Sequence, residues 1–162
     1  LCNHTFTHAN HSRYPSYYNN TDSALRDIEK NQAALNIPLK IMRMPGHNSW
    51  QVGNRLRTPK LPKELCRVAD SAGYTVAGWD VEWHFKNYST PVEGAGEMLA
   101  EVQRTEKDNA LFNRRHIVIL AHDRMFEKRE YADSLRKFIS LLKQDPENVF
   151  ETIDHYPGIA GQ

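Results

Sequence analysis

The sequence lacks the features that mark several large classes of protein. Two cysteines in 162 residues are too few for the disulfide framework of a small secreted scaffold. No apolar run approaches the roughly 20 residues of a membrane-spanning helix. The net charge is only +1, so we expect no basic surface for nucleic acid or an anionic membrane. No signal peptide is visible, and a chain that begins with Leu1 is expected to be a piece of a longer protein.

The composition that remains is that of a globular protein, with 40% hydrophobic and 25% charged residues. This length suits one domain with a sizeable core and is too short for two ordinary ones. We therefore predict a single domain over residues 1–162. Cys66 falls on the apolar side of a predicted helix, so a buried free thiol is expected there. A bridge between Cys66 and Cys2 is the alternative.

Short apolar runs alternate with helical patterns along the chain, which predicts a parallel sheet with helices packed outside it. Helices are expected from residue 21 up to Pro38 and over 62–73, 92–107 and 129–144, and strands over 39–44, 74–79, 116–121 and 149–153. In such folds, functional residues gather at the C-terminal ends of the strands. Polar or unusual residues follow three of the predicted strands: Arg43 and Pro45, Asp80 and Trp83, and His122 and Asp123.

The segment Asn3-His4-Thr5-Phe6-Thr7-His8 places two histidines four residues apart. On a helix or tight turn, side chains at this spacing share one face at about 6 Å and can bind one metal ion. On a strand, roughly 13 Å of chain would separate them, which is too far. The β-branched Thr5 and Thr7 favour a strand, so a metal site requires a loop or turn here. The alternative is a pair of surface or capping histidines.

Zinc suits two neutral imidazoles, which a carboxylate and a water usually complete in a catalytic site. Cobalt or nickel would accept the same ligands. A third protein ligand is not evident in the sequence.

Four separated segments together resemble the NodB-type polysaccharide deacetylases, the family-four carbohydrate esterases. They are the histidine segment, an Arg-x-Pro segment, an Asp-x-x-Trp segment and a Leu-x-His-Asp segment: residues 3–8, 43–46, 80–83 and 119–123. The resemblance covers essentially the whole chain. It implies a distorted (β/α) barrel with fewer than eight units, whose N-terminal strand–helix portion would be missing from this chain.

Two departures from the family pattern stand out. Arg43 is followed by Met-Pro-Gly-His where the family more often has Pro-Pro and an aromatic residue. In addition, no Thr-Phe-Asp-Asp-like segment occurs, although the family's first motif supplies the general base and the third metal ligand from an Asp pair. In the family that pair lies upstream of the histidines, so the sequence that precedes Leu1 would decide between an enzyme and a non-catalytic relative.

The resemblance implies metal-assisted hydrolysis of N-acetyl groups on a polysaccharide or amino-sugar oligomer. Metal ligands would be His4 and His8, and His122 would be the general acid. Asp80 would orient His122, and Arg43 would pair with the base. The remaining predicted residues, Pro45, Trp83 and Leu120, would line the substrate groove.

Each assignment has a structural alternative. Asp80 could cap a turn after its strand, and Trp83 and Leu120 could be core residues. For the whole chain, the alternatives are a non-catalytic carbohydrate-binding relative and a metal-dependent amidase with a non-sugar substrate. A polysaccharide substrate implies a location outside the cytoplasm, as in the periplasm, the cell wall or a secreted protein.

Overall fold

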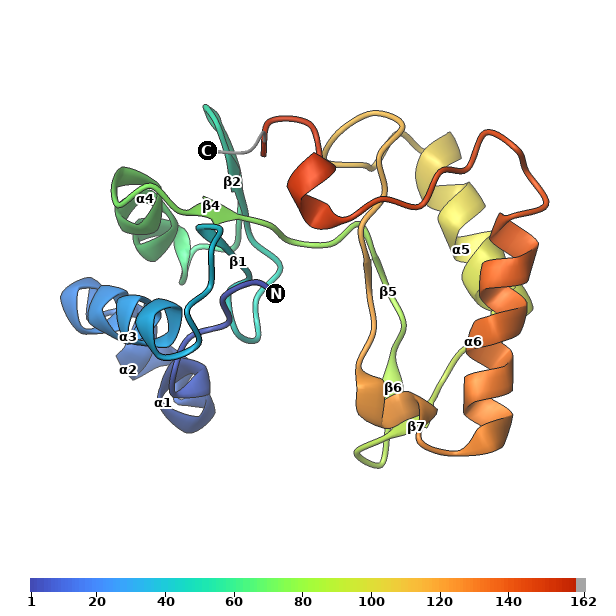
Figure 1. Cartoon of the computed structure of the whole chain (residues 1–162), viewed down its shortest axis with the longest axis horizontal. Helices are drawn as coiled ribbons and strands as arrows, with labels where there is room; N and C mark the ends of the chain where they lie inside the picture. Colours follow the sequence, from blue (N-terminus) through green and yellow to red (C-terminus); the bar gives the residue numbers. More distant parts are fainter. Residues whose placement is uncertain (160–162) are drawn as a thin grey trace. The chain divides into compact units, whose positions relative to one another are not determined.

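The structure, a computed structural model, describes residues 1–159. The chain falls into two compact units, where the sequence predicted one domain over residues 1–162 (Figure 1). The first unit contains residues 1–78 and the C-terminal segment from Thr152, and the second contains residues 79–151. The chain thus leaves the first unit after Gly78 and returns to it at Thr152. Each unit is described by itself.

The first unit combines helical segments with a small sheet. Its elements are α1 (His8–Ser12), α2 (Tyr14–Tyr18), α3 (Thr21–Ala34), β1 (Ile41–Met42), β2 (Trp50–Val52), β3 (Arg55–Arg57), α4 (Lys63–Ser71), β4 (Thr75–Val76) and the 3-10 helix η2 (Ile153–His155). Helix α3 begins one residue after Asn20, whose side chain accepts a hydrogen bond from the Ser23 amide and so caps the first turn. Asn36, with φ +46°, follows its C-terminal end.

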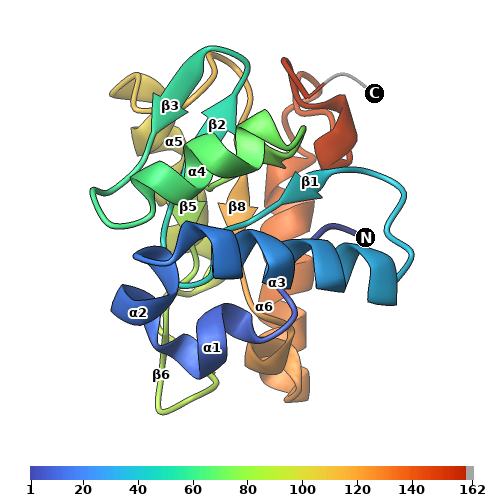
Figure 2. The same cartoon turned by 90° about the vertical axis from the view of Figure 1, so that its left-hand side faces the viewer.

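The sheet of the first unit has the strand order β1-β4-β2-β3. Strands β1 and β4 are parallel, with Ile41 opposite Thr75, whereas β2 and β3 form an antiparallel hairpin. Helices α3 and α4 lie side by side, and α4 also packs against β2 and β4 (Figures 1 and 2). Apolar residues from these elements form one buried cluster, which includes Ile28, Met42, Leu65 and Val76.

The second unit is built around two adjacent helices. Its elements are β5 (Val81–Glu82), β6 (Phe85–Lys86), β7 (Thr90–Pro91), α5 (Ala95–Lys107), β8 (Ile119–Leu120), the 3-10 helix η1 (Asp123–Phe126) and α6 (Arg129–Leu142). Strands β5 and β8 are parallel, and β6 and β7 form a hairpin. Helices α5 and α6 lie side by side (Figure 1). The core contains Trp83, Met98, Met125 and Phe138.

The predicted (β/α) barrel is wrong. Residues 1–159 contain one four-stranded and two two-stranded sheets, and their strands, two or three residues long, do not close into a barrel. The physical reason lies in the loop with Gly46 and Gly53, which forms the β2–β3 hairpin. Strand β2 pairs antiparallel with β4 through Gln51 and Val76, and so takes the edge that the next parallel strand would need. The strand expected over residues 149–153 is also absent, since 149–152 are irregular and η2 follows.

Three other expectations are met. The four long helices occur where the apolar periodicity places them, with ends shifted by up to three residues. Cys66 is a buried free thiol, and Cys2 is also unbridged. Within residues 1–159, no helix is both long enough and apolar enough to cross a membrane.

Candidate functional site

The eight predicted site residues fall into two sets, one in each unit. His4, His8, Arg43 and Pro45 belong to the first unit, and Asp80, Trp83, Leu120 and His122 belong to the second.

The backbone of Asn3 extends the parallel edge of β1. Its N–H donates to the Ile41 carbonyl oxygen at 2.8 Å, and its carbonyl accepts from the Arg43 N–H at 3.0 Å. His4 therefore leaves the end of β1 beside Arg43. Thr5, with φ +66°, then turns the chain away from the strand direction that its β-branched side chain favours.

The Asn3 side chain is buried and uses all of its hydrogen-bonding capacity. Its Nδ2 donates to the Ile28 carbonyl and to Gln32 Oε1, at 2.9 and 2.8 Å. Its Oδ1 accepts from the Thr5 N–H and from Asn31 Nδ2, both at 2.9 Å. The residue before His4 is thereby fixed to α3. Because a buried amide with four partners has one allowed orientation, the start of the histidine segment is rigidly held.

The segment from His8 to Ser12, labelled α1, is a left-handed helical turn. Its five residues have φ between +49° and +66°. The turn closes through bonds from the His11 N–H to the Thr7 carbonyl and from the Arg13 N–H to the Ala9 carbonyl, at 2.9 and 3.0 Å. A left-handed turn costs roughly 1–2 kcal/mol for each L-residue, so the surroundings must hold it in place.

Asp27 of α3 supplies much of that support. Its Oδ2 accepts from the Thr7 N–H, from Thr7 Oγ1 and from Tyr17 Oη, at 3.3, 3.1 and 3.2 Å. Thr7 Oγ1 in turn accepts from the Asn10 N–H at 2.8 Å and caps the left-handed turn. Through these contacts, helix α3 holds the histidine segment as a loop, although Thr5 and Thr7 favour a strand.

This loop brings the two histidine rings together. Their centroids lie 5.1 Å apart, with an angle of 71° between the ring planes. Two imidazoles bound to one zinc ion at about 2.0–2.1 Å in a tetrahedral arrangement have centres about 5 Å apart. A strand would separate the two histidines by roughly 13 Å, too far to share an ion, and this separation does not occur. Simple edge-to-face packing has the same ring spacing.

In each ring, the Nδ1 atom lies close to a protein oxygen. Nδ1 of His4 lies 2.8 Å from the Arg43 carbonyl oxygen, and Nδ1 of His8 lies 3.1 Å from Ser12 Oγ. Histidines that bind metals use this pattern, in which one ring nitrogen donates to a protein oxygen and the other binds the ion. The pair therefore fits a metal as two ligands. Within residues 1–159, no group of three or more His, Cys, Asp or Glu side chains is arranged to hold an ion.

Arg43 and Pro45 lie on the loop that follows β1. Pro45 is buried, and its carbonyl oxygen accepts from Tyr18 Oη at 2.7 Å. Gly46, with φ +68°, lies against the Tyr14 ring so closely that a Cβ atom would come 2.4 Å from a ring carbon. The sequence predicted a functional role only for residues 43–46, the first four of this loop. In the structure, Tyr14 and Tyr18 of α2 also contact the loop.

His47 closes the Met-Pro-Gly-His segment that departs from the family pattern, but the sequence assigned it no role. Its ring packs edge-on against those of Tyr14 and Tyr18, at 5.5 and 5.1 Å between centroids. Burial lowers the pKa of His47, which favours the neutral imidazole. No periodicity in the sequence indicates this packing.

In the second unit, the Asp80 carboxylate binds backbone. Oδ1 accepts from the Phe112 N–H at 2.7 Å, and Oδ2 accepts from the Val118 N–H at 3.0 Å. These bonds tie the start of β5 to the segment that leads into β8. They match the turn-capping alternative for Asp80, while its predicted role toward His122 stays a prediction.

Trp83, Leu120 and His122 lie close to the core of the second unit. Trp83 is fully buried, packs against Phe126 and Phe138, and donates from Nε1 to the Glu93 carbonyl at 2.8 Å. Leu120 is also buried. The half-buried His122 lies two residues after the end of β8, and its ring meets that of Phe85 edge-on, with centroids 5.2 Å apart. The substrate-lining roles of Trp83 and Leu120 stay predictions.

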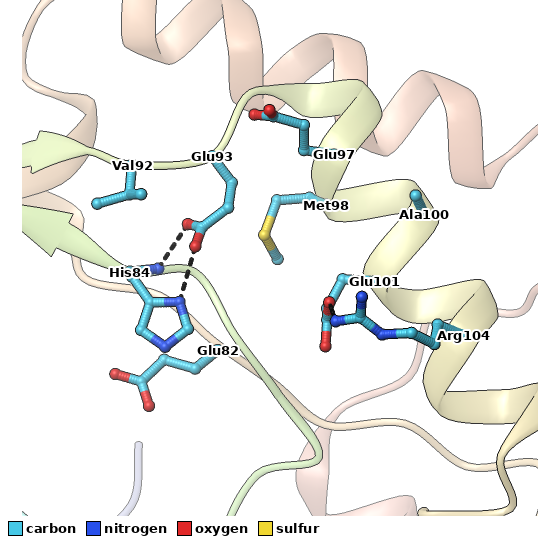
Figure 3. A pocket seen from close by; sticks show the side chains of 9 residues that line it. All are labelled: Glu82, His84, Val92, Glu93, Glu97, Met98, Ala100, Glu101 and Arg104. Carbon is cyan, nitrogen blue, oxygen red and sulfur yellow. Dashed lines mark hydrogen bonds and ion pairs between the residues drawn. The ribbon is translucent and has the colours of Figure 1, made fainter.

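A shallow hollow of about 510 Å³ lies in the second unit beside α5 (Figure 3). It is lined by none of the eight predicted site residues, and its polar groups are Glu82, His84, Glu93, Glu97, Glu101 and Arg104. Each is engaged nearby: Glu93 holds the N–H and Nδ1 of His84, at 2.9 and 2.8 Å. Glu82 accepts from Trp79 Nε1, Glu97 from the Gly94 N–H, and Glu101 pairs with Arg104.

No protein-family model matches the chain, and no curated protein matches it significantly. A functional assignment therefore rests on the residues and their geometry.

Proposed function

We propose that this chain belongs to a metal-dependent carbohydrate deacetylase, a hydrolase that removes N-acetyl groups from a polysaccharide or amino-sugar oligomer. One observation carries the proposal: the rings of His4 and His8 lie 5.1 Å apart, and each engages a protein oxygen through Nδ1. The order of the four motifs supports it. The proposal depends on the residues of these four segments and does not require a barrel, which the described residues do not form.

In the proposed site, His4 and His8 each bind the metal through Nε2. The neutral His4 ring must carry its proton on Nδ1, because the Arg43 carbonyl can only accept, and its lone pair is therefore on Nε2. A bound zinc ion supplies Lewis-acid polarisation of the acetamide carbonyl and a water of lowered pKa. Cobalt or nickel fits the same two ligands.

His122 is proposed as the general acid that protonates the departing amine. An imidazole suits this role because its pKa lies close to neutrality. Asp80 is proposed to orient it and Arg43 to face an anion, while Pro45, Trp83 and Leu120 are proposed to contribute to substrate binding. The 162 residues contain no counterpart of the family's aspartate pair, which supplies the base. Such a substrate places the protein outside the cytoplasm.

Zinc titration by calorimetry tests the metal site. We expect wild-type protein to bind zinc, and His4→Ala and His8→Ala each to weaken binding by more than about 100-fold, since a ligand matters more than the outer contacts whose loss costs 10–100-fold. His11→Asn is the matched control, because this exposed histidine lies in the same left-handed turn. Equal zinc binding by wild type and His4→Ala would remove the site from consideration.

Acetate release from N-acetylglucosamine oligomers tests the reaction in a full-length protein that supplies the base, which these 162 residues lack. It should stop with a chelator, resume with added zinc, and be lost in His122→Ala while the zinc content stays unchanged. Hydrolysis of small non-sugar amides alone would favour the amidase alternative. Oligomer binding without acetate release would favour the non-catalytic alternative.

A further inference from the structure

Four side chains of the second unit form one continuous stack. The His122 ring meets Phe85 edge-on at 5.2 Å between centroids. The Arg124 guanidinium carbon lies 4.5 Å from the centre of the Phe85 ring and 4.7 Å from that of Tyr88. Arg124 is thus held between two aromatic rings, and the stack ends at the candidate general acid.

The stack joins two elements. Phe85 and Tyr88 come from the β6–β7 hairpin, while His122 and Arg124 come from the segment 122–124, in which His122 precedes η1 and Arg124 lies in its first turn. The hairpin therefore contacts that segment twice, once on each side of Asp123. These paired contacts restrict both the position and the ring orientation of His122.

Tyr88 lies at the surface in the turn of the β6–β7 hairpin. The residue is 75% exposed and has φ +74°, a backbone region that a bulky residue rarely takes. In addition, Nε of Arg124 is buried without a hydrogen-bond partner among the described residues. A buried donor without a partner is unfavourable, so stacking on the two rings must hold the guanidinium in place.

We propose that Phe85 and Arg124 are positioning residues for His122. Phe85 fixes the imidazole plane, and Arg124, held between Phe85 and Tyr88, fixes Phe85. A proton donor must be aimed at the leaving nitrogen, and a displacement near 1 Å can lower the rate by about 100-fold. The catalytic part of this proposal rests on the proposed role of His122 as general acid.

The His122 ring resonances of labelled protein in nuclear magnetic resonance spectra provide a test that needs no activity. In wild type, the Phe85 ring current should displace these resonances from their positions in a free imidazole. Phe85→Leu should remove the displacement and Phe85→Tyr should restore it. Arg124→Lys, which keeps the charge but loses the planar group, should reduce it. Arg129→Gln is the control, because this arginine of the same unit is 95% exposed.

Kinetics then test the catalytic consequence. With N-acetylglucosamine oligomers, Phe85→Leu should lower kcat by about 10- to 100-fold with little change in KM, and Phe85→Tyr should recover most of the loss. Unchanged His122 resonances in both Phe85→Leu and Arg124→Lys would overturn the proposal. If Phe85→Leu fails to fold, Arg124→Lys still decides. A full-length protein that supplies the base and still releases no acetate contradicts the proposed function, while the resonances still test the positioning.

Discussion

The Nδ1 atom of His4 lies 2.8 Å from the carbonyl oxygen of Arg43, a residue 39 positions further along the chain. The contact joins residues 3–8 and 43–46, which are two separate motifs in the sequence. It also selects the His4 tautomer, because a carbonyl oxygen accepts and cannot donate. The position of the β1 end therefore determines which nitrogen of His4 can act as a ligand.

Exchanging Asn10 tests the left-handed turn. Asn10→Gly should be more stable than Asn10→Ala by about 1 kcal/mol, because glycine takes φ +53° without the clash that a Cβ atom meets. Urea denaturation of the two variants measures the difference. In a right-handed turn the order would be reversed, since alanine is the better helix former.

Removal of the Asn3 side chain should destabilise the first unit. Asn3→Ala leaves several buried partners of the amide unpaired, so we expect a loss of about 2–4 kcal/mol in the free energy of unfolding. Arg26→Ala is the control, because Arg26 is an exposed residue of α3, the helix to which the Asn3 side chain is hydrogen-bonded. A loss no greater than that of the control would show that the network contributes little.

Alkaline pH should weaken the fold through Cys66. Burial raises the pKa of this thiol from 9.0 to about 11. Between these values the unfolded chain releases a proton that the folded protein keeps, so the free energy of unfolding falls as pH rises. The full fall, over the difference between these two pKa values, is about 3 kcal/mol.

Urea midpoints of wild type and Cys66→Ala between pH 8 and pH 11 measure this term, and the slope should be smaller in the variant. Burial also raises the pKa values of Tyr17 and Tyr18, so part of the slope should remain. Identical slopes for the two proteins would contradict the assignment to Cys66.

Substitution of Asp80 separates its two predicted roles. Asp80→Ala removes the acceptor for the Phe112 and Val118 amides and should destabilise the second unit by about 2–4 kcal/mol. Asp80→Asn keeps one acceptor oxygen and should lose about half as much. Hydrogen exchange at these two amides reports the effect directly. Unchanged exchange in Asp80→Ala would mean that the carboxylate acts elsewhere.

The helices could be predicted from the sequence because their signal is local. Apolar residues that recur at helical spacing are enough to place α3, α4, α5 and α6. The sheet could not be predicted, because alternation of strands and helices does not specify which edges pair. The loop with Gly53 became a hairpin, and its strand β2 occupies an edge of β4 that the barrel required.

For the same reason, the candidate site could be predicted only in part from the sequence. The histidine spacing identified His4 and His8, but the geometry depends on Asp27, whose carboxylate binds Thr7 from another part of the chain. Local preference at Thr5 and Thr7 pointed to a strand. No motif signalled the packing of His47 or the stack on Arg124, since each depends on aromatic residues from a different element.

The return of the chain to the first unit has a consequence for synthesis on the ribosome. Tyr156 packs on Trp50 with ring centroids 5.3 Å apart, so the unit whose residues emerge first needs some of the last residues to be complete. The second unit is fully emerged once residue 151 has left the exit tunnel. Because domains fold as units during translation, the inner unit can finish folding first, and the first unit, which contains the histidine segment, is completed only after the segment from Thr152 has emerged.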